Sequence, residues 1–255
     1  MDTAKLDQAL TFAKKLKNLA KRRAHSVLLR SSLVPNEFHQ LYYGLAGEGG
    51  RAWERTSWMG TKILKCPFDL WIYQELIHAH RPDLIIETGT CYGGSALYMA
   101  HICDLVGHGE IVTIDIKARG TPAHPRIQYL SGSSVAPEIL ERVRDLVKTR
   151  PRTLVVLDSD HRREHVLAEL RAYQEFVPNG GYMVVEDTNV NGHPVYPEFG
   201  PGPMEALEQF LGESQDFRSD PECEKFHLTF NPKGFLRRQS GGANVGYGAP
   251  ASATR

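Results

Sequence analysis

Between residues 83 and 188, short apolar runs alternate with segments of helical periodicity, and this alternation limits the chain to few folds. The runs read "DLIIETG", "GEIVTIDI", "RIQYLSG", "TLVVLDSD" and "GGYMVVEDT". Unbroken Val, Ile and Leu are typical of strands that are buried on both faces of a parallel sheet. Right-handed crossovers between such strands build a doubly wound sheet covered by helices. The sequence therefore predicts an α/β, Rossmann-like fold with a mostly parallel sheet.

The regions that flank this alternation complete the predicted organisation. The core domain is predicted over residues 67–238, and it ends in an antiparallel hairpin, "KFHLTFNPKGFLRRQ", whose turn places Pro232 and Gly234 where a turn favours them. Residues 36–66 are rich in aromatic residues and glycine with weak periodicity, so they are predicted to form an irregular cap or lid. Residues 239–255 are rich in Gly, Ala and Ser and are predicted to be a disordered tail.

Charge is concentrated at the N-terminus. Residues 1–35 carry eight lysines and arginines against two aspartates, with leucines at roughly helical spacing. This pattern predicts a basic amphipathic helix. Such a helix packs on the body or on a sister subunit, or it contacts an anionic membrane surface.

The overall composition excludes several classes of protein. Thirty basic and thirty acidic side chains give a formal net charge of zero, which argues against a nucleic-acid-binding protein. The four cysteines are widely spaced and form no C-x-x-C pair, which indicates a reducing compartment. The chain has neither a signal peptide's apolar core nor a run that could span a bilayer, so we expect a cytoplasmic protein.

The loop "LIIETGTCYGGSA" joins the first predicted strand of the sheet to the next helix, at the edge where such sheets bind ligands. A P-loop would need lysine where Ser95 stands, and a dinucleotide loop would need G-x-G-x-x-G, so both interpretations fail. The pattern E-x-G-x-x-x-G-G is instead typical of the S-adenosylmethionine loop of class I methyltransferases. Alternatively, these glycines only permit tight packing of the strand against the helix.

Each part of this cofactor has predicted partners in the sequence. Asp115 ends the second strand, where a carboxylate accepts both ribose hydroxyls. Glu87 is predicted to pair with the cofactor's ammonium group, and serines after the third strand are predicted to line the adenine. The full predicted set of cofactor-binding residues is Glu87, Gly89, Thr90, Tyr92, Gly93, Ser95, Asp115, Ser131, Ser133, Asp158 and Asp160.

Three carboxylates follow two further strands of the predicted sheet. Asp158 ends the fourth strand, and Glu186 and Asp187 end the fifth. Neighbouring strand ends lie roughly 5 Å apart, so the three side chains are predicted to converge beside the glycine loop. Like charges this close raise one another's pKa unless a cation neutralises them, and hard oxygen ligands favour Mg²⁺ or Mn²⁺. Alternatively, some of these acids only cap helices or bind water.

The segment "HRREH" (161–165) fits the H-x-x-E-H pattern of inverted zinc peptidases. In such enzymes both histidines lie on one helix face. Here His161 stands at the mouth of the helix, three residues after Asp158, so we predict it to be a general base. His165 is predicted to be a packing or surface residue. As an alternative, His161 only forms hydrogen bonds at the helix start.

Five segments together resemble a known family: "KCPFDLWIYQELI", "LIIETGTCYGGSALYMA", "VLDSDH", "VVEDTNVNGHPV" and "GPGPMEALEQF". Over residues 36–238 the chain is similar to the rhamnosyl O-methyltransferase and cephalosporin hydroxylase-like family, in particular to the mycobacterial members that act on phenolic glycolipids. The resemblance implies a class I methyltransferase fold and S-adenosylmethionine-dependent, Mg²⁺-assisted methylation of a hydroxyl, usually on a deoxysugar. It also implies assembly into homo-oligomers.

The resemblance carries residue roles to this sequence. It implies Asp158, Glu186 and Asp187 as metal ligands and His161 as the base, while Asp160 touches the cofactor or replaces Asp158 on the metal. The acceptor is then a small-molecule or glycolipid sugar. The aromatic residues that either stack on that sugar or pack in the core are Tyr42, Tyr43, Trp53 and Trp58.

Three alternatives remain at this point. His193 is a second candidate base. A related enzyme that hydroxylates or methoxylates a β-lactam is disfavoured because no 2-His-1-carboxylate set is evident. A non-catalytic subunit that only binds the cofactor would have no need to retain all three acids and the histidine.

Overall fold

The computed structural model describes residues 33–44, 46–47, 50–117 and 121–239, together with Lys14, Lys15, Lys17, Leu19 and Lys21. Most of the predicted N-terminal helix (1–35) and, apart from Gln239, the whole predicted tail (239–255) lie outside these residues. Among the described helices, none combines the length and the apolar character needed to cross a membrane.

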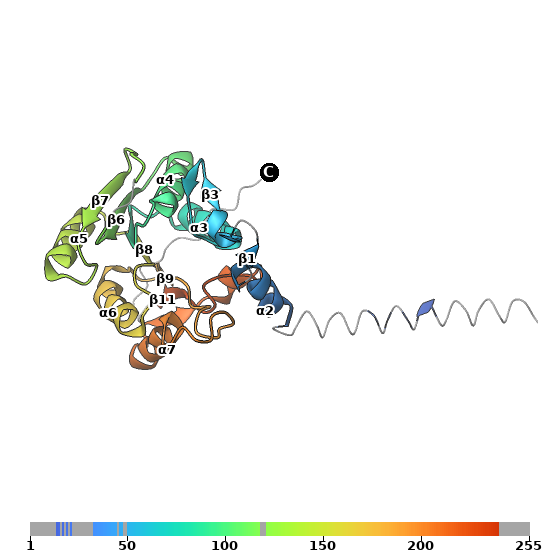
Figure 1. The fold of residues 1–255 in the computed structure, drawn as a ribbon. Coiled ribbons are helices and arrows are strands. Elements are labelled where there is room, and N and C mark those ends of the chain that lie inside the picture. The colour runs from blue at the N-terminus through green and yellow to red at the C-terminus, as the bar shows by residue number, and fades with distance from the viewer. Residues whose placement is uncertain are drawn as a thin grey trace, which may run out of the picture.

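Seven strands form one sheet in the order β10-β11-β9-β8-β5-β6-β7 (Figure 1). The five strands from β9 to β7 are parallel, whereas β11 is antiparallel to β9 and β10 is antiparallel to β11. The predicted fold, a mostly parallel doubly wound sheet with a C-terminal antiparallel hairpin, is confirmed. The strands are β5 (Leu84–Thr88), β6 (Glu110–Asp115), β7 (Ile127–Ser131), β8 (Thr153–Leu157), β9 (Tyr182–Val185), β10 (Phe217–Ser219) and β11 (Phe235–Arg238).

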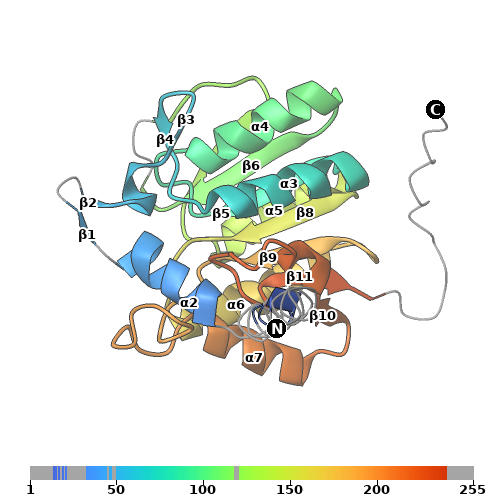
Figure 2. The same ribbon diagram turned by 90° about the vertical axis from the view of Figure 1, so that its right-hand side faces the viewer.

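Helices cover both faces of the sheet, which explains why its central strands are apolar throughout. Alternate residues of a strand point to opposite faces, so Leu84 and Ile86 of β5 join one apolar core while Ile85 joins the other. The helices α3 and α4 lie in front of the sheet in Figure 2, and α5, α6 and α7 contribute to the core of the opposite face. The helices are α3 (Pro67–His80), α4 (Gly94–Val106), α5 (Pro137–Thr149), α6 (Arg163–Tyr173) and α7 (Pro203–Glu213), with 3-10 turns η3 (Gln174–Phe176) and η4 (Pro221–Glu224).

The C-terminal hairpin differs from the predicted one in its first strand. The turn at 231–234 is present, since the Gly234 amide donates to the Asn231 carbonyl at 2.8 Å. However, β11 pairs with β10, and residues 226–230 form no strand. The physical reason is tertiary: the Phe230 amide donates to the buried Asp69 carboxylate at 2.8 Å, and its ring packs against Tyr43. Both contacts draw this segment away from the sheet.

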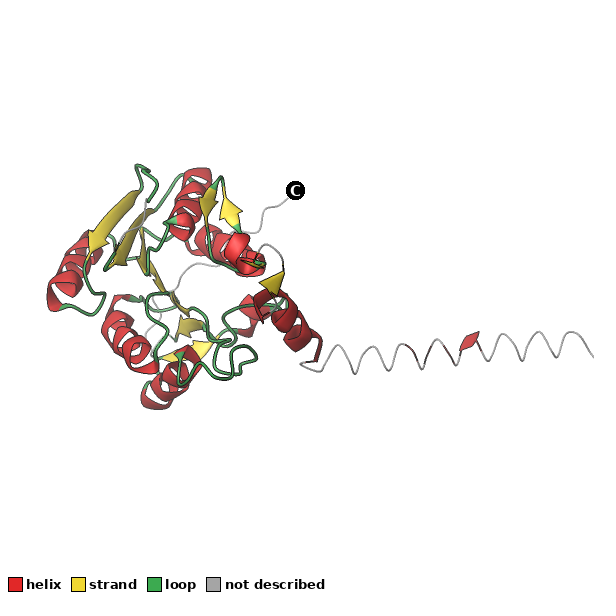
Figure 3. Cartoon of the chain, viewed as in Figure 1, coloured by secondary structure: helices red, strands yellow, loops and turns green. Residues whose placement is uncertain are grey.

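The predicted cap is built of short pieces at the side of the sheet where the parallel strands end (Figure 3). Its helix and two small hairpins are too short to be recognised by periodicity. Trp58 of one hairpin donates to His101 of α4 at 2.9 Å and packs edge-on against Tyr98. The pieces are α2 (Leu33–His39), the π-helix η1 (Gln40–Gly44), β1 (Ala46–Gly47), β2 (Gly50–Arg51), the 3-10 turn η2 (Trp53–Arg55), β3 (Ser57–Trp58) and β4 (Thr61–Lys62).

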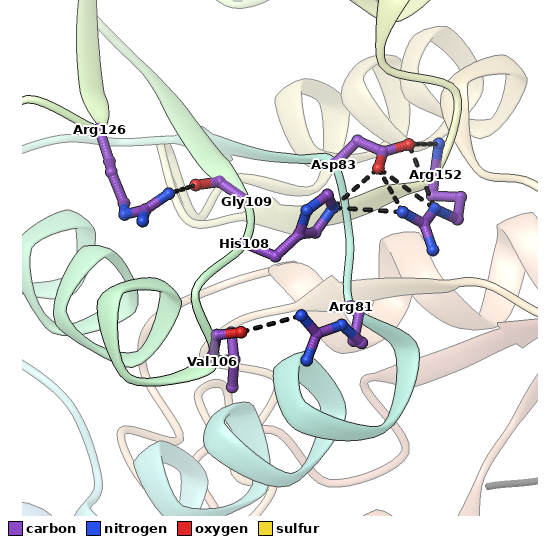
Figure 4. A network of polar contacts seen from close by, with 7 residues as sticks. All are labelled: Arg81, Asp83, Val106, His108, Gly109, Arg126 and Arg152. Atoms are coloured by element: carbon purple, nitrogen blue, oxygen red, sulfur yellow. Dashed lines mark hydrogen bonds and ion pairs between the residues drawn. The ribbon is translucent and has the colours of Figure 1, made fainter.

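At the opposite edge of the sheet, where the parallel strands begin, Asp83 connects the residues that precede β5, β6 and β8 (Figure 4). Its carboxylate accepts hydrogen bonds from the Arg152 guanidinium at 2.6 Å and from the Arg152 amide at 3.1 Å, and it lies 2.8 Å from His108. Burial alone would raise the pKa of Asp83, but the hydrogen bonds from Arg152 and His108 outweigh it and lower the pKa to about 2. The network therefore stabilises the sheet rather than a binding site.

Asp83→Asn is expected to lower the free energy of unfolding by about 1–2 kcal/mol at pH 7, allowing for partial solvent screening. Because the folded-state pKa lies below the unfolded one, this stabilisation is present above roughly pH 4 and is lost as the pH falls toward 2. Urea unfolding of both proteins at pH 7 and at about pH 3 should show the difference shrinking. The exposed Asp145→Asn serves as the control, and an equal difference at both pH values would contradict the prediction.

Candidate functional site

A cavity of about 570 Å³ opens at the carboxyl edge of the parallel strands. Residues from the cap, the glycine loop and the ends of β6, β8 and β9 line it, together with the loop after β7. Of the predicted site residues, those in its wall are Gly89, Thr90, Tyr92, Ser95, Asp115, Ser133, Asp158, Asp160, His161 and Asp187. Four predicted residues are not in the wall: Glu87, Gly93, Ser131 and Glu186.

The glycines of the loop are required by the packing of the chain as well as by the cavity. A Cβ at Gly89 would lie 1.9 Å from the Asp158 carbonyl oxygen, and one at Gly94 would lie 2.2 Å from the Lys62 carbonyl oxygen. Gly89 also has φ +88°, which favours glycine. At Gly93 the Cβ would meet Pro122 at 2.8 Å, so Gly93 shapes the loop without reaching the cavity. The two closest contacts are with the backbone after β8 and with the end of β4, so they differ from the predicted alternative, in which the glycines pack a strand against a helix.

Glu87 lies beneath the loop instead of facing the cavity. It is fully buried and accepts a hydrogen bond from Thr113 at 2.6 Å, while Thr113 and Thr90 are 2.7 Å apart. Burial raises the pKa of Glu87, and hydrogen bonds from Ser95 and Thr113 oppose that effect. The geometry does not support the predicted pairing of Glu87 with an ammonium group of the cofactor. The carboxylate instead connects β6 to the loop.

The far end of the cavity contains Asp115 and the loop after β7. The Asp115 carboxylate accepts from the Cys91 amide at 2.8 Å and from the Lys117 amide at 2.8 Å, so it is fixed at the cavity wall. Ser131, at the end of β7, is exposed and is not part of the cavity wall, so the structure does not support its predicted contact with the adenine. Ser133 does line the cavity.

His165 also lines this end of the cavity, in contrast to its predicted packing or surface role. Its Nε2 lies 3.2 Å from the Ser134 hydroxyl and 3.5 Å from the buried Glu169 carboxylate. The hydrogen bond with Glu169 raises the pKa of His165. Because α6 begins only at Arg163, His161 is not on the same helix as His165, and the zinc peptidase arrangement does not form.

The other end of the cavity brings Asp158, His161 and Asp187 together. One potential ligand atom from each lies within 4.8 Å of the others, and the His161 Nε2 is 3.2 Å from an Asp187 oxygen. Asp160 instead pairs with Arg162, its Oδ1 lying 3.0 Å from the guanidinium Nε. Between the two predicted candidates for the first acid, the geometry therefore favours Asp158 over Asp160.

Glu186 is adjacent to this group but faces a different partner. Its Oε1 lies 2.9 Å from the Lys65 ammonium and accepts a hydrogen bond from the Tyr73 hydroxyl. Lys65 also contacts Asp158 at 2.7 Å. The predicted convergence of three acids on one cation is thus corrected: Asp158 and Asp187 share a group with His161, and Glu186 adjoins it through Lys65. Direct binding of the cation by Glu186 stays a prediction.

The electrostatics of this group follow from burial among like charges. Burial raises the pKa of Asp158 well above its ordinary range, with Glu186 and Asp187 adding to the rise and Lys65 opposing it. Burial likewise raises the pKa of Asp187, against the opposing effect of His161. For Lys65, burial favours the neutral form, but the carboxylates of Asp158 and Glu186 outweigh it and raise its pKa. Strongly shifted acids in a cleft are typical of functional sites.

Two of the four candidate aromatic residues reach the cavity beside the acids. Tyr43 and Trp53 both line it, with stacked rings 4.9 Å apart. The Trp53 indole donates to the Tyr43 carbonyl at 3.1 Å, which fixes the pair. Tyr42 and Trp58 pack against other parts of the protein. His193 is also outside the cavity and lies 3.0 Å from Glu205, so it is no longer a candidate base.

Lys65 is the residue of this site that the sequence did not indicate. It is the first residue of "KCPFDLWIYQELI", one of the segments that carry the family resemblance, but neither that resemblance nor any periodicity assigned a role to it. Only the tertiary fold shows that its ammonium reaches the ends of two strands.

A comparison with protein families places the chain among known sequences. The family model described as rhamnosyl O-methyltransferase/CmcI matches residues 50–239. The rhamnosyl O-methyltransferase of Mycobacterium tuberculosis (strain H37Rv) is 40% identical over 216 residues, covering 82% of this chain and 86% of that protein. The protein of the same name from Mycobacterium leprae (strain TN) is 40% identical over 213 residues, covering 81% of this chain and 91% of that protein.

Solved structures agree with the fold. The structure described as "CmcI-N160 apo-structure" matches with a TM-score of 0.61 at 18% identity, covering 76% of this chain and 81% of that chain. The structure described as "cmcI-D160 Mg-SAM" matches with a TM-score of 0.60 at 18% identity, covering 79% of this chain and 84% of that chain. These likenesses confirm the Rossmann-like fold that was predicted for a class I methyltransferase.

Proposed function

Because this chain belongs to the rhamnosyl O-methyltransferase/CmcI family, we propose that it methylates a hydroxyl of a deoxysugar, rhamnosyl or similar, using S-adenosylmethionine and Mg²⁺ or Mn²⁺. One observation carries the proposal. Asp158, His161 and Asp187 form a compact group in the wall of the same cavity that the glycine loop and Asp115 line. A base, a cation site and a donor site therefore adjoin.

The residues of the site fit both the divalent cation and the sulfonium donor. Ionised Asp158, Glu186 and Asp187 bring three negative charges against the single positive charge of Lys65, and a divalent cation balances the remaining two. Asp158 and Asp187 would hold this cation, since carboxylate oxygens suit Mg²⁺ and Mn²⁺. When bound, the cation supplies Lewis acidity that makes a sugar hydroxyl a better nucleophile, and the sulfonium donor supplies the methyl group.

Residues of the chain bind the donor, accept the proton and orient the base. The Asp115 carboxylate would accept hydrogen bonds from the ribose hydroxyls of the donor, and the loop residues in the cavity wall, such as Gly89 and Ser95, would support its methionine part. His161 accepts the proton of the attacking hydroxyl, a contribution of about 10²–10⁴-fold in typical enzymes. Asp187, 3.2 Å from the His161 Nε2, orients the ring.

The acceptor end of the cavity suits a sugar ring. The stacked pair of Tyr43 and Trp53 lies in the wall that also contains Asp187. Aromatic rings offer an apolar surface for the C–H face of a sugar, while the acids and His161 face its hydroxyls. This arrangement supports a sugar as the acceptor, in keeping with the rhamnosyl group in the names of the relatives. A glycolipid or a glycosylated natural product as the carrier of that sugar stays a prediction.

The setting of the reaction is also a proposal. The four cysteines form no disulfide with one another, in keeping with the predicted reducing, cytoplasmic compartment. A homo-oligomer and contact of the basic N-terminus with an anionic membrane surface remain predictions. Both can be tested by light scattering and by sedimentation with anionic vesicles.

The function is tested by titration calorimetry and product analysis. We expect S-adenosylmethionine to bind with or without Mg²⁺, and methyl transfer to a rhamnoside, seen as a mass gain of one CH₂, to require the metal. Removal of the metal with EDTA should stop turnover, and Mg²⁺ should restore it. Donor binding without metal-dependent transfer to any sugar would favour a binding subunit, and modification of a β-lactam would favour the rival enzyme.

A further inference from the structure

Lys65 is a buried ammonium between two acids of the site. It is 4% exposed, and its Nζ lies 2.7 Å from Asp158 and 2.9 Å from Glu186. We infer that Lys65 is a built-in counter-charge: it lets this acidic edge of the sheet fold without a metal ion, and it limits how tightly a divalent cation binds there. The second part rests on the proposed function, whereas the first does not.

The position of Lys65 in the chain explains how it reaches both acids. It precedes α3, whose first residue is Pro67, and the hairpin β3–β4 lies directly before it. The same helix supplies the Tyr73 hydroxyl, which donates to the Glu186 oxygen that Lys65 contacts. The cap and α3 therefore bring a cation and a hydrogen-bond donor to the ends of β8 and β9.

No other lysine or arginine in the described part of the chain forms an ion pair with these acids. The one further pairing is between Asp187 and His161, whose charge depends on protonation. Asp69, on α3, is also buried, and Glu186 contributes to raising its pKa after burial itself. Lys65 thus faces several carboxylates with little other positive charge nearby. Removing one partner of a buried ion pair is strongly destabilising because the remaining charge stays buried without compensation.

A divalent cation can replace this charge but must also share the site with it. At a separation of a few ångströms, a fixed ammonium repels a metal ion strongly even at an effective dielectric constant of about 20. Lys65 therefore acts in opposite directions on the two properties. It stabilises the metal-free protein, and it weakens the binding of the metal.

Lys65→Met tests the inference because methionine keeps much of the apolar stem and removes the charge. In EDTA, the melting temperature of the full-length variant is expected to fall by about 10 °C or more. Mn²⁺ should raise the melting temperature of the variant more than that of the wild type, and it should bind the variant at least about tenfold more tightly by calorimetry.

The matched control is Lys62→Met, at the end of the hairpin that precedes Lys65. Lys62 is exposed, and its ammonium lies 5.1 Å from the centre of the Tyr92 ring. Within the described part of the chain it forms no ion pair with a carboxylate. Its substitution should change the metal-free melting temperature by no more than about 2 °C. An equal fall in both variants, or weaker Mn²⁺ binding by Lys65→Met, would overturn the inference.

A double variant distinguishes charge from packing if Lys65→Met does not fold. Adding Glu186→Gln removes one of the uncompensated charges and keeps an acceptor for Tyr73. The inference predicts that Lys65→Met/Glu186→Gln regains metal-free stability, whereas a double variant that also fails to fold would overturn it. Absence of Mn²⁺ binding by the wild type would contradict the proposed function, and the melting temperatures in EDTA would still decide the role of Lys65.

Discussion

Asp187→Asn is expected to reduce methyl transfer by about 10³-fold or more while changing the affinity for S-adenosylmethionine by less than about threefold. The amide removes the negative charge that would hold the cation and orient His161, 3.2 Å away. Asparagine is the suitable replacement because residue 187 has φ +55°, a conformation that asparagine tolerates better than alanine does. The amide of residue 187 would still donate to Asn231 at 2.9 Å.

Lost methyl transfer with unchanged donor affinity would distinguish the acid-containing end of the cavity from its donor-binding end. Steady-state methylation of a rhamnoside measures the first, and calorimetry with S-adenosylmethionine measures the second. Asp145→Asn removes an exposed aspartate of α5 that pairs only with Lys148 among the described ion pairs, and it should leave both values unchanged. Loss of donor binding in Asp187→Asn would mean that Asp187 belongs to the donor site and that the proposed division of roles is wrong.

Gly89→Ala is expected to lower the free energy of unfolding by at least about 4 kcal/mol. The new Cβ would lie 1.9 Å from the Asp158 carbonyl oxygen and 2.5 Å from its carbon. These are backbone atoms at the end of β8, so the methyl group can be accommodated only by moving the end of β5 away from β8. The same movement would displace Asp158, so donor and cation sites should be lost with stability.

Gly60→Ala provides a control with the same backbone strain. Gly60 has φ +83°, close to the +88° of Gly89, but its Cβ would meet nothing within 4 Å. Left-handed strain alone costs about 1–2 kcal/mol, so the difference between the two variants measures the steric overlap. Urea unfolding followed by circular dichroism gives both values. Equal stabilities would show that the ends of β5 and β8 separate easily.

Much of the site was predictable because parallel strands end at one edge of a sheet. Asp115, Asp158 and Asp187 follow buried apolar runs, so their placement at the cavity follows from the order of the strands. His161 was predictable for the same reason, since it stands three residues beyond a strand end. The glycine pattern located the loop correctly, although it could not show that Gly89 and Gly94 are also required by contacts with the Asp158 and Lys62 backbones.

The errors concern side chains whose direction depends on distant segments. Glu87 follows the same strand-end rule, yet its carboxylate turns beneath the loop toward Thr113. Glu186 and Asp187 are adjacent in sequence, but only Asp187 takes the left-handed conformation that turns it toward His161, whereas Glu186 faces Lys65 and Tyr73. The first strand of the hairpin was misplaced because Phe230 is held by Asp69 of α3.

The sequence by itself determined the layered α/β fold and the edge at which the cavity opens. Strands buried on both faces have continuous apolar sequences, and the residues that follow parallel strands lie at the same edge of the sheet. Tertiary structure alone decided that Asp158, His161 and Asp187 form one compact group, and it added Lys65 from the cap. The reason is that a buried charge is oriented by whichever opposite charge reaches it, and that partner lies 93 positions from Asp158 along the chain.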